Sequence, residues 1–186
     1  MLPELLLLFH LAATQPQNKA DSNVVLASHT ISMEDRYNNK FVNDVFKYNI
    51  LLAVKYMGNK ITLTPGQVFA FHDSILPSYK ANLAKTTNAH FNSAEGFKYD
   101  GDLVGDGVCH LASLMYWTAL DAGLTSYAPS NHNFAKINDI DPKYGVAIQA
   151  PMPMGNLYIT NNLDKPVTFE FDYDGTNLTL KILTSE

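Results

Sequence analysis

The segment VGDGVCHLASLMYWTALDAGL, from Val104 to Leu124, combines two glycines, the single cysteine of the chain and a long apolar run. Its apolar residues recur at three- and four-residue intervals, which is the period of a helix, and they cover most of the helix surface. We therefore predict a mostly buried helix from Cys109 to Ala122, ended by Gly123. A helix that is apolar on most sides has to lie at the centre of the fold.

The flanking sequence supplies a second helix and several strands. Residues 38–57 have the helical period, and Gly58 follows as a stop. KITLTPGQVFAF predicts a hairpin of two strands around a Pro65-Gly66 turn, and residues 73–100 predict a long irregular loop. Four candidate strands follow the central helix: YGVAIQA, NLYITNN, PVTFEFDYD and LTLKIL. This order predicts a single α+β domain, in which the central helix carries the cysteine at its N-terminus and packs on an antiparallel sheet.

The beginning of the chain has a different character. Leu5 to Ala13 is an apolar run followed by small and polar residues, like the core and cleavage region of a secretory signal, although no basic residue precedes it. It is too short to span a bilayer, which takes about 20 apolar residues. We assign residues 1–35 to this signal-like segment and a polar linker with one short extended piece, NVVLAS, and residues 36–186 to the folded domain. We expect export to the cell envelope or the extracellular space, with a loose membrane tether as a possible role of the run and a short surface helix as the alternative.

Charge and cysteine content exclude several classes of partner. The net charge is −5, and Lys and Arg form no cluster, so we expect no nucleic-acid partner. A single cysteine excludes an internal disulfide and a multi-cysteine metal site. The histidines show no reliable ligand spacing with Cys109, so we expect no metal and no cofactor. The sequence leaves the oligomeric state open.

The position of Cys109 indicates a nucleophile. In the first turn of a helix, free backbone amides and the helix dipole favour negative charge, which stabilises a thiolate and lowers the pKa of the thiol. Gly105 and Gly107 let backbone amides approach a substrate oxygen, as an oxyanion hole requires. The alternative is a structural cysteine in an apolar helix.

A thiol nucleophile needs a base, and two histidines are candidates. His132 heads the apolar segment NFAKI, which we predict to lie as a strand beside the start of the helix. His110 is adjacent to Cys109, but consecutive side chains on a helix diverge by about 100°. The group that orients the imidazole stays open among five residues: Asn131, Asn133, Asp139, Asp141 and Gln149.

Several segments, in one order from about residue 38 to the C-terminus, resemble the VanW family. PGQVFAFH is similar to its Pro-Gly-Glu-x-Phe-Ser-Phe-Asn motif, and VGDGVCH to its Gly-Gly-Gly-x-Cys-Gln signature. A helix ending Ala-Gly-Leu and a strand ending Asn161-Asn162 follow, as they do in the family. The chain departs from the pattern at Asp106, which replaces a glycine, at His110, which replaces a glutamine, and around His132, where SNHN replaces His-Pro-His-Ser.

The resemblance implies a function at the bacterial cell envelope. The family takes its name from glycopeptide-resistance gene clusters, and some VanW domains act as peptidoglycan L,D-transpeptidases through the motif cysteine. It implies that Cys109 attacks a peptidoglycan stem peptide, that the backbone at Gly105 and Gly107 holds the oxyanion, and that His132 moves the proton, with His110 as a second imidazole. The alternative is a non-catalytic module of the same fold that binds cell-wall peptide or a surface protein.

Overall fold

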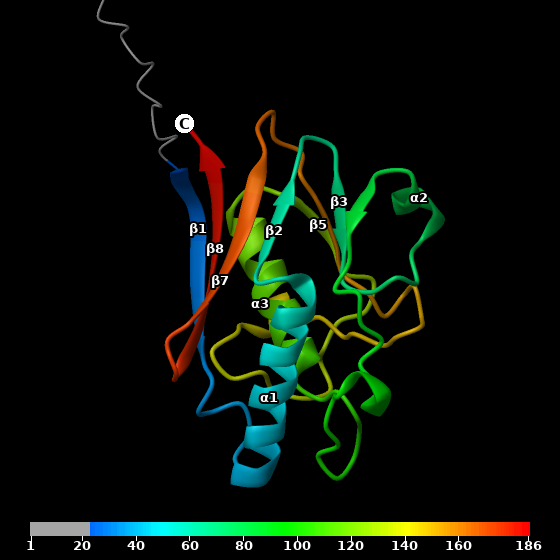
Figure 1. The fold of residues 1–186 in the computed structure, drawn as a ribbon, viewed down its shortest axis with the longest axis vertical. Helices are drawn as coiled ribbons and strands as arrows, with labels where there is room; N and C mark the ends of the chain where they lie inside the picture. Colours follow the sequence, from blue (N-terminus) through cyan, green and yellow to red (C-terminus); the bar gives the residue numbers. More distant parts are fainter. Residues whose placement is uncertain (1–22) are drawn as a thin grey trace, which may run out of the picture.

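In the computed structural model, which describes residues 23–186, two four-stranded sheets lie side by side, with helix α3 (Val108–Asp121) packed against them (Figure 1). The first sheet is antiparallel and contains, in spatial order, β1 (Asn23–Ser32), β8 (Asn177–Ser185), β7 (Val167–Tyr173) and β2 (Lys60–Leu63). The second contains β4 (Leu83–Lys85), β3 (Val68–Ala70), β6 (Tyr158–Thr160) and β5 (Thr125–Tyr127), and only β3 and β4 are parallel. The predicted α+β class with a single domain is confirmed.

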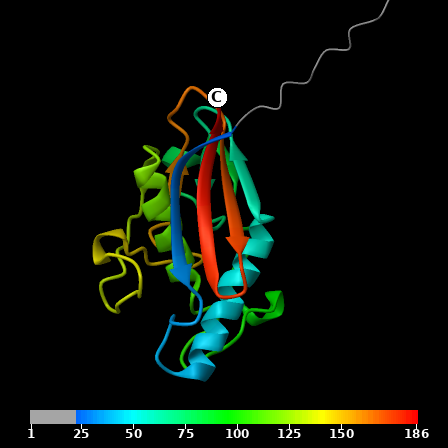
Figure 2. The same ribbon diagram turned by 90° about the vertical axis from the view of Figure 1, so that its left-hand side faces the viewer.

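The first sheet forms one continuous layer of β1, β8 and β7 (Figure 2). Along β8, Leu178, Leu180 and Ile182 are fully buried, and Val167 and Phe169 of β7 lie on the same apolar side. This alternation follows from the two-residue period of a strand, which places every second side chain on one face. Helix α3 contacts β1, β8 and β5, so both sheets cover its apolar surface, as a buried helix requires.

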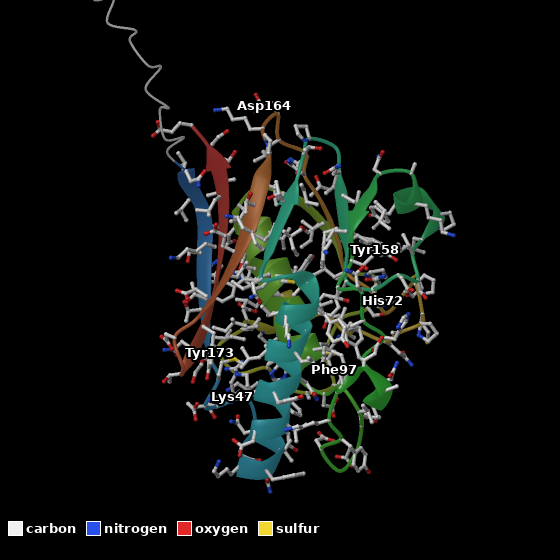
Figure 3. The ribbon with its side chains drawn as sticks, viewed as in Figure 1. Lys47, His72, Phe97, Tyr158, Asp164 and Tyr173 are labelled. Atoms are coloured by element: carbon white, nitrogen blue, oxygen red, sulfur yellow. The ribbon has the colours of Figure 1, made fainter. Side chains whose placement is uncertain are left out.

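Helix α1 (Lys40–Met57) is the helix predicted from the first periodic segment. The side chain of Asn39 caps it by accepting hydrogen bonds from the amides of the second and third following residues, and Gly58 ends it with a φ of +90°. Lys47 on its outer side pairs with Glu34 and lies 5.7 Å from the ring of Tyr173 on β7 (Figure 3). These contacts attach α1 to the first sheet at the C-terminal end of β7.

The predicted hairpin of β2 and β3 is wrong, although both strands exist. The turn between them is present, with Gly66 at φ +79° and a hydrogen bond from the amide of Gln67 to the carbonyl of Thr64. Beyond the turn the strands separate, because buried Asn161 takes the backbone groups that a hairpin would pair. The side-chain NH2 group of Asn161 donates a hydrogen bond to Leu63 O (2.9 Å), and its backbone N–H donates one to Gln67 O (2.9 Å). Strand β2 therefore joins the first sheet and β3 the second.

Other segments differ from the expectations in extent. The short extended piece before α1 is the ten-residue strand β1, which pairs along its length with β8. The long loop holds helix α2 (Pro77–Lys80), β4 and the short helix η1 (Ser93–Glu95). The predicted strand YGVAIQA is wrong, since after the short helix η2 (Pro142–Tyr144) only Val146 forms an isolated bridge, with Asn131.

The apolar run from Leu5 to Ala13 lies outside the described residues. Within residues 23–186, no helix combines the length and the apolar character needed to cross a membrane.

Candidate active site

The start of α3 is fixed by two close backbone contacts. Gly107, the N-cap, has a φ of +102°, and a Cβ atom there would lie 2.8 Å from the carbonyl oxygen of Phe46 on α1. Gly105 has a φ of +88°, and its Cβ would lie 2.8 Å from the carbonyl oxygen of Phe91. Only glycine fits both the positive φ and the contact. The two glycines of the motif thus allow α1 and the preceding loop to pack directly against the turn that leads into Cys109.

A pocket of about 660 Å³ opens at this end of α3. Cys109, His110 and His132 all line it, together with Gly105 and Gly107. The fold therefore gathers the predicted nucleophile, both candidate imidazoles and the glycine-rich turn around one cavity. Exposed apolar side chains stand among its lining residues: Tyr37, Leu103, Val104 and Phe134.

The sulfur of Cys109 contacts the backbone of Ile148. The Ile148 amide donates a hydrogen bond to the sulfur (N to S, 3.3 Å). The thiol in turn donates a long hydrogen bond to the Ile148 carbonyl oxygen (S to O, 3.9 Å). Ser113, one turn along α3, holds this segment in place, because its hydroxyl donates to Cys109 O (2.7 Å) and accepts from the amide of Val146 (2.9 Å). Within residues 23–186, no hydrogen bond joins the sulfur to an imidazole.

The predicted lowering of the thiol pKa is wrong. Burial raises the pKa of Cys109 to about 11, and the negative charge of Asp106 adds to the rise. Hydrogen bonds from the backbone amides of Ile148 and of Cys109 itself act in the opposite direction, as expected for a helix N-terminus, but they are weaker than the loss of solvent. The resting group near neutral pH is therefore a thiol, and a base has to remove its proton before it can attack.

His132 lies in an irregular segment and not on the predicted strand. Its Nδ1 is 3.1 Å from the carbonyl oxygen of Ala135, and since a carbonyl only accepts, Nδ1 carries the proton and Nε2 is the basic nitrogen. Burial lowers the pKa of this buried imidazole, so it is neutral at pH 7. A neutral imidazole with a free Nε2 is the form that can accept a thiol proton.

A backbone carbonyl, and not a side chain, therefore orients His132. Asp139 accepts hydrogen bonds from the guanidinium of Arg36 and the amide of Ser32, and Asp141 caps η2. Asn131 forms a backbone bridge with Val146. Asn131, Asn133 and Gln149 are exposed, and within residues 23–186 none of the five candidates hydrogen-bonds to the ring. No sequence pattern distinguishes a carbonyl as an orienting group, because every residue has one.

His110 is a second neutral imidazole in the pocket wall. It is 5% exposed, and burial, followed by the charge of Arg36, lowers its pKa to about 3. Its ring centroid lies 6.2 Å from that of His132 and 5.2 Å from that of Phe46, edge-on in both cases. Its Nδ1 is buried without a hydrogen-bond partner in the described part of the chain, which is unusual because buried polar atoms are nearly always paired.

Two charged residues at the pocket were not predicted as site residues. The sequence pattern assigned no role to Arg36, and it marked Asp106 only as a departure from the family motif. Arg36 is the only arginine in the sequence, and this rarity is the one sequence signal that could have drawn attention to it. It is 2% exposed, and its guanidinium donates hydrogen bonds to the Asp139 carboxylate (2.5 Å) and to Asn138 O (3.0 Å). Asp106 is half-buried beside the nucleophile, and burial with its hydrogen bond to Asp100 raises its pKa to about 7.

Other histidines have different surroundings. His72 lies on the side of the second sheet, near Tyr158, and its fully buried ring bonds to Gly155 O (2.8 Å) (Figure 3). His90 is exposed at the pocket and lies between Glu95 and Asp73 (2.7 and 3.1 Å). Among the described residues, no group of three or more His, Cys, Asp or Glu side chains is arranged to hold a metal ion.

Comparison of the sequence with known proteins identifies one family whose model matches most of the chain. The model of the family described as "VanW like protein" matches residues 46–183, which include the greater part of α1, all of α3, and both sheets except β1 and the last residues of β8. No curated protein and no solved structure matches the chain.

Proposed function

Because the chain belongs to the VanW family, we propose that it is a cysteine-dependent acyltransferase that cross-links peptidoglycan stem peptides at the bacterial cell envelope, in the manner of an L,D-transpeptidase. The main support is one arrangement: the only thiol of the chain and two neutral imidazoles line the same pocket. An exported protein is the form in which this activity would meet its substrate.

The first half of the reaction forms a thioester. His132 Nε2 takes the proton of Cys109, and the sulfur attacks the carbonyl carbon of the diamino acid at position three of the stem. The peptide bond to D-alanine breaks, and the imidazolium returns the proton to the leaving amine. The amide of Ile148, already directed at the sulfur, is placed to donate to the oxyanion once the sulfur has moved onto the substrate.

The second half transfers the acyl group. The amine of a neighbouring stem attacks the thioester carbon and gives a proton to His132, the carbon–sulfur bond breaks, and the proton passes to the departing thiolate. The apolar rim formed by Tyr37, Leu103, Val104 and Phe134 provides surface against which stem side chains can pack. The sulfur has to leave its contact with Ile148 for this cycle.

A second candidate function is a non-catalytic module that binds cell-wall peptide in the same pocket. One observation favours it: the sulfur is engaged by Ile148 and its thiol pKa is high, as in a structural cysteine. Under this function Cys109 contributes packing, and peptide binding survives its replacement.

The test is to incubate the purified full chain with muropeptides that carry tetrapeptide stems. The acyltransferase releases D-alanine and gains the mass of an acyl group, and Cys109→Ala loses both. The matched control is His29→Asn, outside the pocket, which keeps both. If the native protein releases no D-alanine and forms no adduct while Cys109→Ala still binds the peptide, the binding module replaces the acyltransferase.

A further inference from the structure

Two buried nitrogens at the pocket of Cys109 have no hydrogen-bond partner. They are Arg36 Nε and His110 Nδ1, and within residues 23–186 no other buried side-chain nitrogen or oxygen lacks a partner. Arg36 is 2% exposed and His110 is 5% exposed, and both residues line the pocket. Buried polar groups are nearly always paired, so two exceptions at one cavity indicate that a ligand supplies the partner.

Helix α1 holds the two residues in neighbouring parts of the pocket wall. The backbone amide of Arg36 donates to the side chain of Asn43 (2.6 Å). The ring of His110 packs edge-on against the ring of Phe46, with the centroids 5.2 Å apart. Asn43 and Phe46 are three residues apart on α1 and both are buried, so they lie on the same side of the helix.

The chemistry of these nitrogens selects a carboxylate. Arg36 Nε always carries a proton and can only donate, and the other guanidinium nitrogens already donate to Asn138 O and to Asp139. With a pKa of about 3, the ring of His110 is neutral at pH 7 and can carry its proton on Nδ1, which then also donates. Two donors in one wall, one of them charged, fit the two oxygens of a carboxylate better than a single uncharged acceptor.

The charges around the pocket fit a ligand that has both an acid and an amine. The Arg36 side chain is fully buried, whereas that of its partner Asp139 is 40% exposed, so water weakens the field of Asp139 more than that of the guanidinium. Three carboxyl groups also line the pocket and oppose a simple anion: Asp100, Asp102 and Asp106. The diamino acid at position three of a stem peptide carries an amine that suits this acidic side.

We propose that Arg36 and His110 bind the C-terminal carboxylate of the stem peptide that Cys109 attacks. This inference rests on the proposed function for the identity of the peptide. His110 directly follows Cys109, and the carboxylate of D-alanine is separated from the attacked carbonyl carbon only by the nitrogen and the Cα atom of D-alanine. Of all the carboxylates of the stem, it is the one that lies nearest to the sulfur. The two residues thus make the protein specific for stems that end in a free D-alanine.

The experiment measures dissociation constants by isothermal titration calorimetry at pH 7. The full chain carries Cys109→Ala, so that no bond is broken during the titration. The probes are tetrapeptide stems that end in D-alanine or in D-alaninamide, each prepared with L-lysine and with meso-diaminopimelate at position three. Hydrogen bonds to a charged group predict that the acid binds about 10- to 100-fold more tightly than the amide, with either residue at position three.

Pocket variants separate carboxylate binding from a structural role, because the readout is the ratio of acid to amide affinity. In the Cys109→Ala chain, His110→Leu removes the donor and brings the ratio close to one, whereas His110→Gln keeps an N–H donor and retains most of the preference. Arg36→Lys keeps a positive charge beside Asp139 but has no Nε–H, and the ratio falls. The control is His29→Leu, outside the pocket, which leaves the ratio unchanged. Melting curves by circular dichroism establish folding, and if Arg36→Lys does not fold, the two His110 variants decide.

The proposal is overturned if acid and amide bind equally, if neither binds, or if folded His110→Leu keeps the preference. A preference that follows the residue at position three and not the C-terminus assigns the site to another carboxylate and also overturns it. Release of D-alanine by the native protein tests the proposed function separately. A native protein that releases none, while the Cys109→Ala chain still prefers the acid, refutes the acyltransferase and leaves this inference standing.

Discussion

The backbone amide of Ile148 donates a hydrogen bond to the sulfur of Cys109 across 3.3 Å. The contact exists because Ser113 ties the backbone segment that follows η2 to the first turns of α3. An amide directed at a sulfur favours the thiolate, whereas the burial that accompanies this contact favours the thiol. Burial is the stronger of the two, so the site at rest holds a protonated nucleophile.

This raised pKa predicts a loss of stability at alkaline pH. The pKa of Cys109 is about 11 in the folded chain and 9.0 as an ordinary thiol, so the unfolded chain loses its proton first as the pH rises. Stability is thus fully present below pH 9 and falls between pH 9 and 11, by about 2–3 kcal/mol. Urea unfolding of the native chain and of Cys109→Ser, which has no such titration, measures the difference. Parallel curves above pH 9 would refute the assignment.

The hydrogen bond from His132 Nδ1 to Ala135 O leaves Nε2 as the basic nitrogen, which predicts how the activity depends on His132 and how it falls at acidic pH. His132→Asn keeps a small polar side chain but has no basic nitrogen, and D-alanine release should fall about 10²–10⁴-fold. Since burial lowers the pKa of His132, the native activity should decline only below pH 6.5. A rate profile from pH 4 to 8 tests both statements. An acid limb centred above pH 6.5 would point to another base.

The contact between Gly107 and Phe46 predicts that one methyl group added at position 107 lowers the free energy of unfolding by a large amount. Gly107→Ala combines strain at φ +102° with a Cβ that would lie 2.8 Å from a backbone oxygen, so we expect a loss of about 3 kcal/mol or more. Gly175→Ala is the matched control, with a φ of +103° and no atom within 4 Å of the added Cβ. Its loss should be about 1–2 kcal/mol. Equal losses in thermal unfolding would mean that the contact with Phe46 relaxes.

The burial of Asn161 predicts that it contributes more to the stability of the fold than its exposed neighbour Asn162. Asn161 is fully buried, and its side chain donates to Leu63 O and Lys165 O (2.9 Å each). Asn161→Ala leaves these carbonyls unpaired and should cost about 2–4 kcal/mol. The exposed Asn162 bonds to Thr125 and Gly123, and Asn162→Ala should cost about 1 kcal/mol. Chemical denaturation of both variants checks the order, and a reversed order would contradict it.

Local periodicity determined most of the secondary structure. The helix that begins at Lys40 and the helix that carries Cys109 were predictable, because a buried face repeats every three or four residues and Gly58 and Gly123 stop the pattern. The alternation in β7 was predictable for the same kind of reason. The ordered motifs around Cys109 also carried the family, since a family signature is itself a property of the sequence.

Pairing, solvent exposure and proton affinity were decided by the tertiary structure. Whether β2 pairs with β3 depended on Asn161, almost 100 residues along the chain from β2, and the group that orients His132 proved to be a backbone carbonyl. The pKa of Cys109 depended on how far the folded chain shields the sulfur from water. A sequence specifies which groups are present and how they repeat locally. Their energies depend on neighbours and dielectric surroundings that only the folded chain brings together.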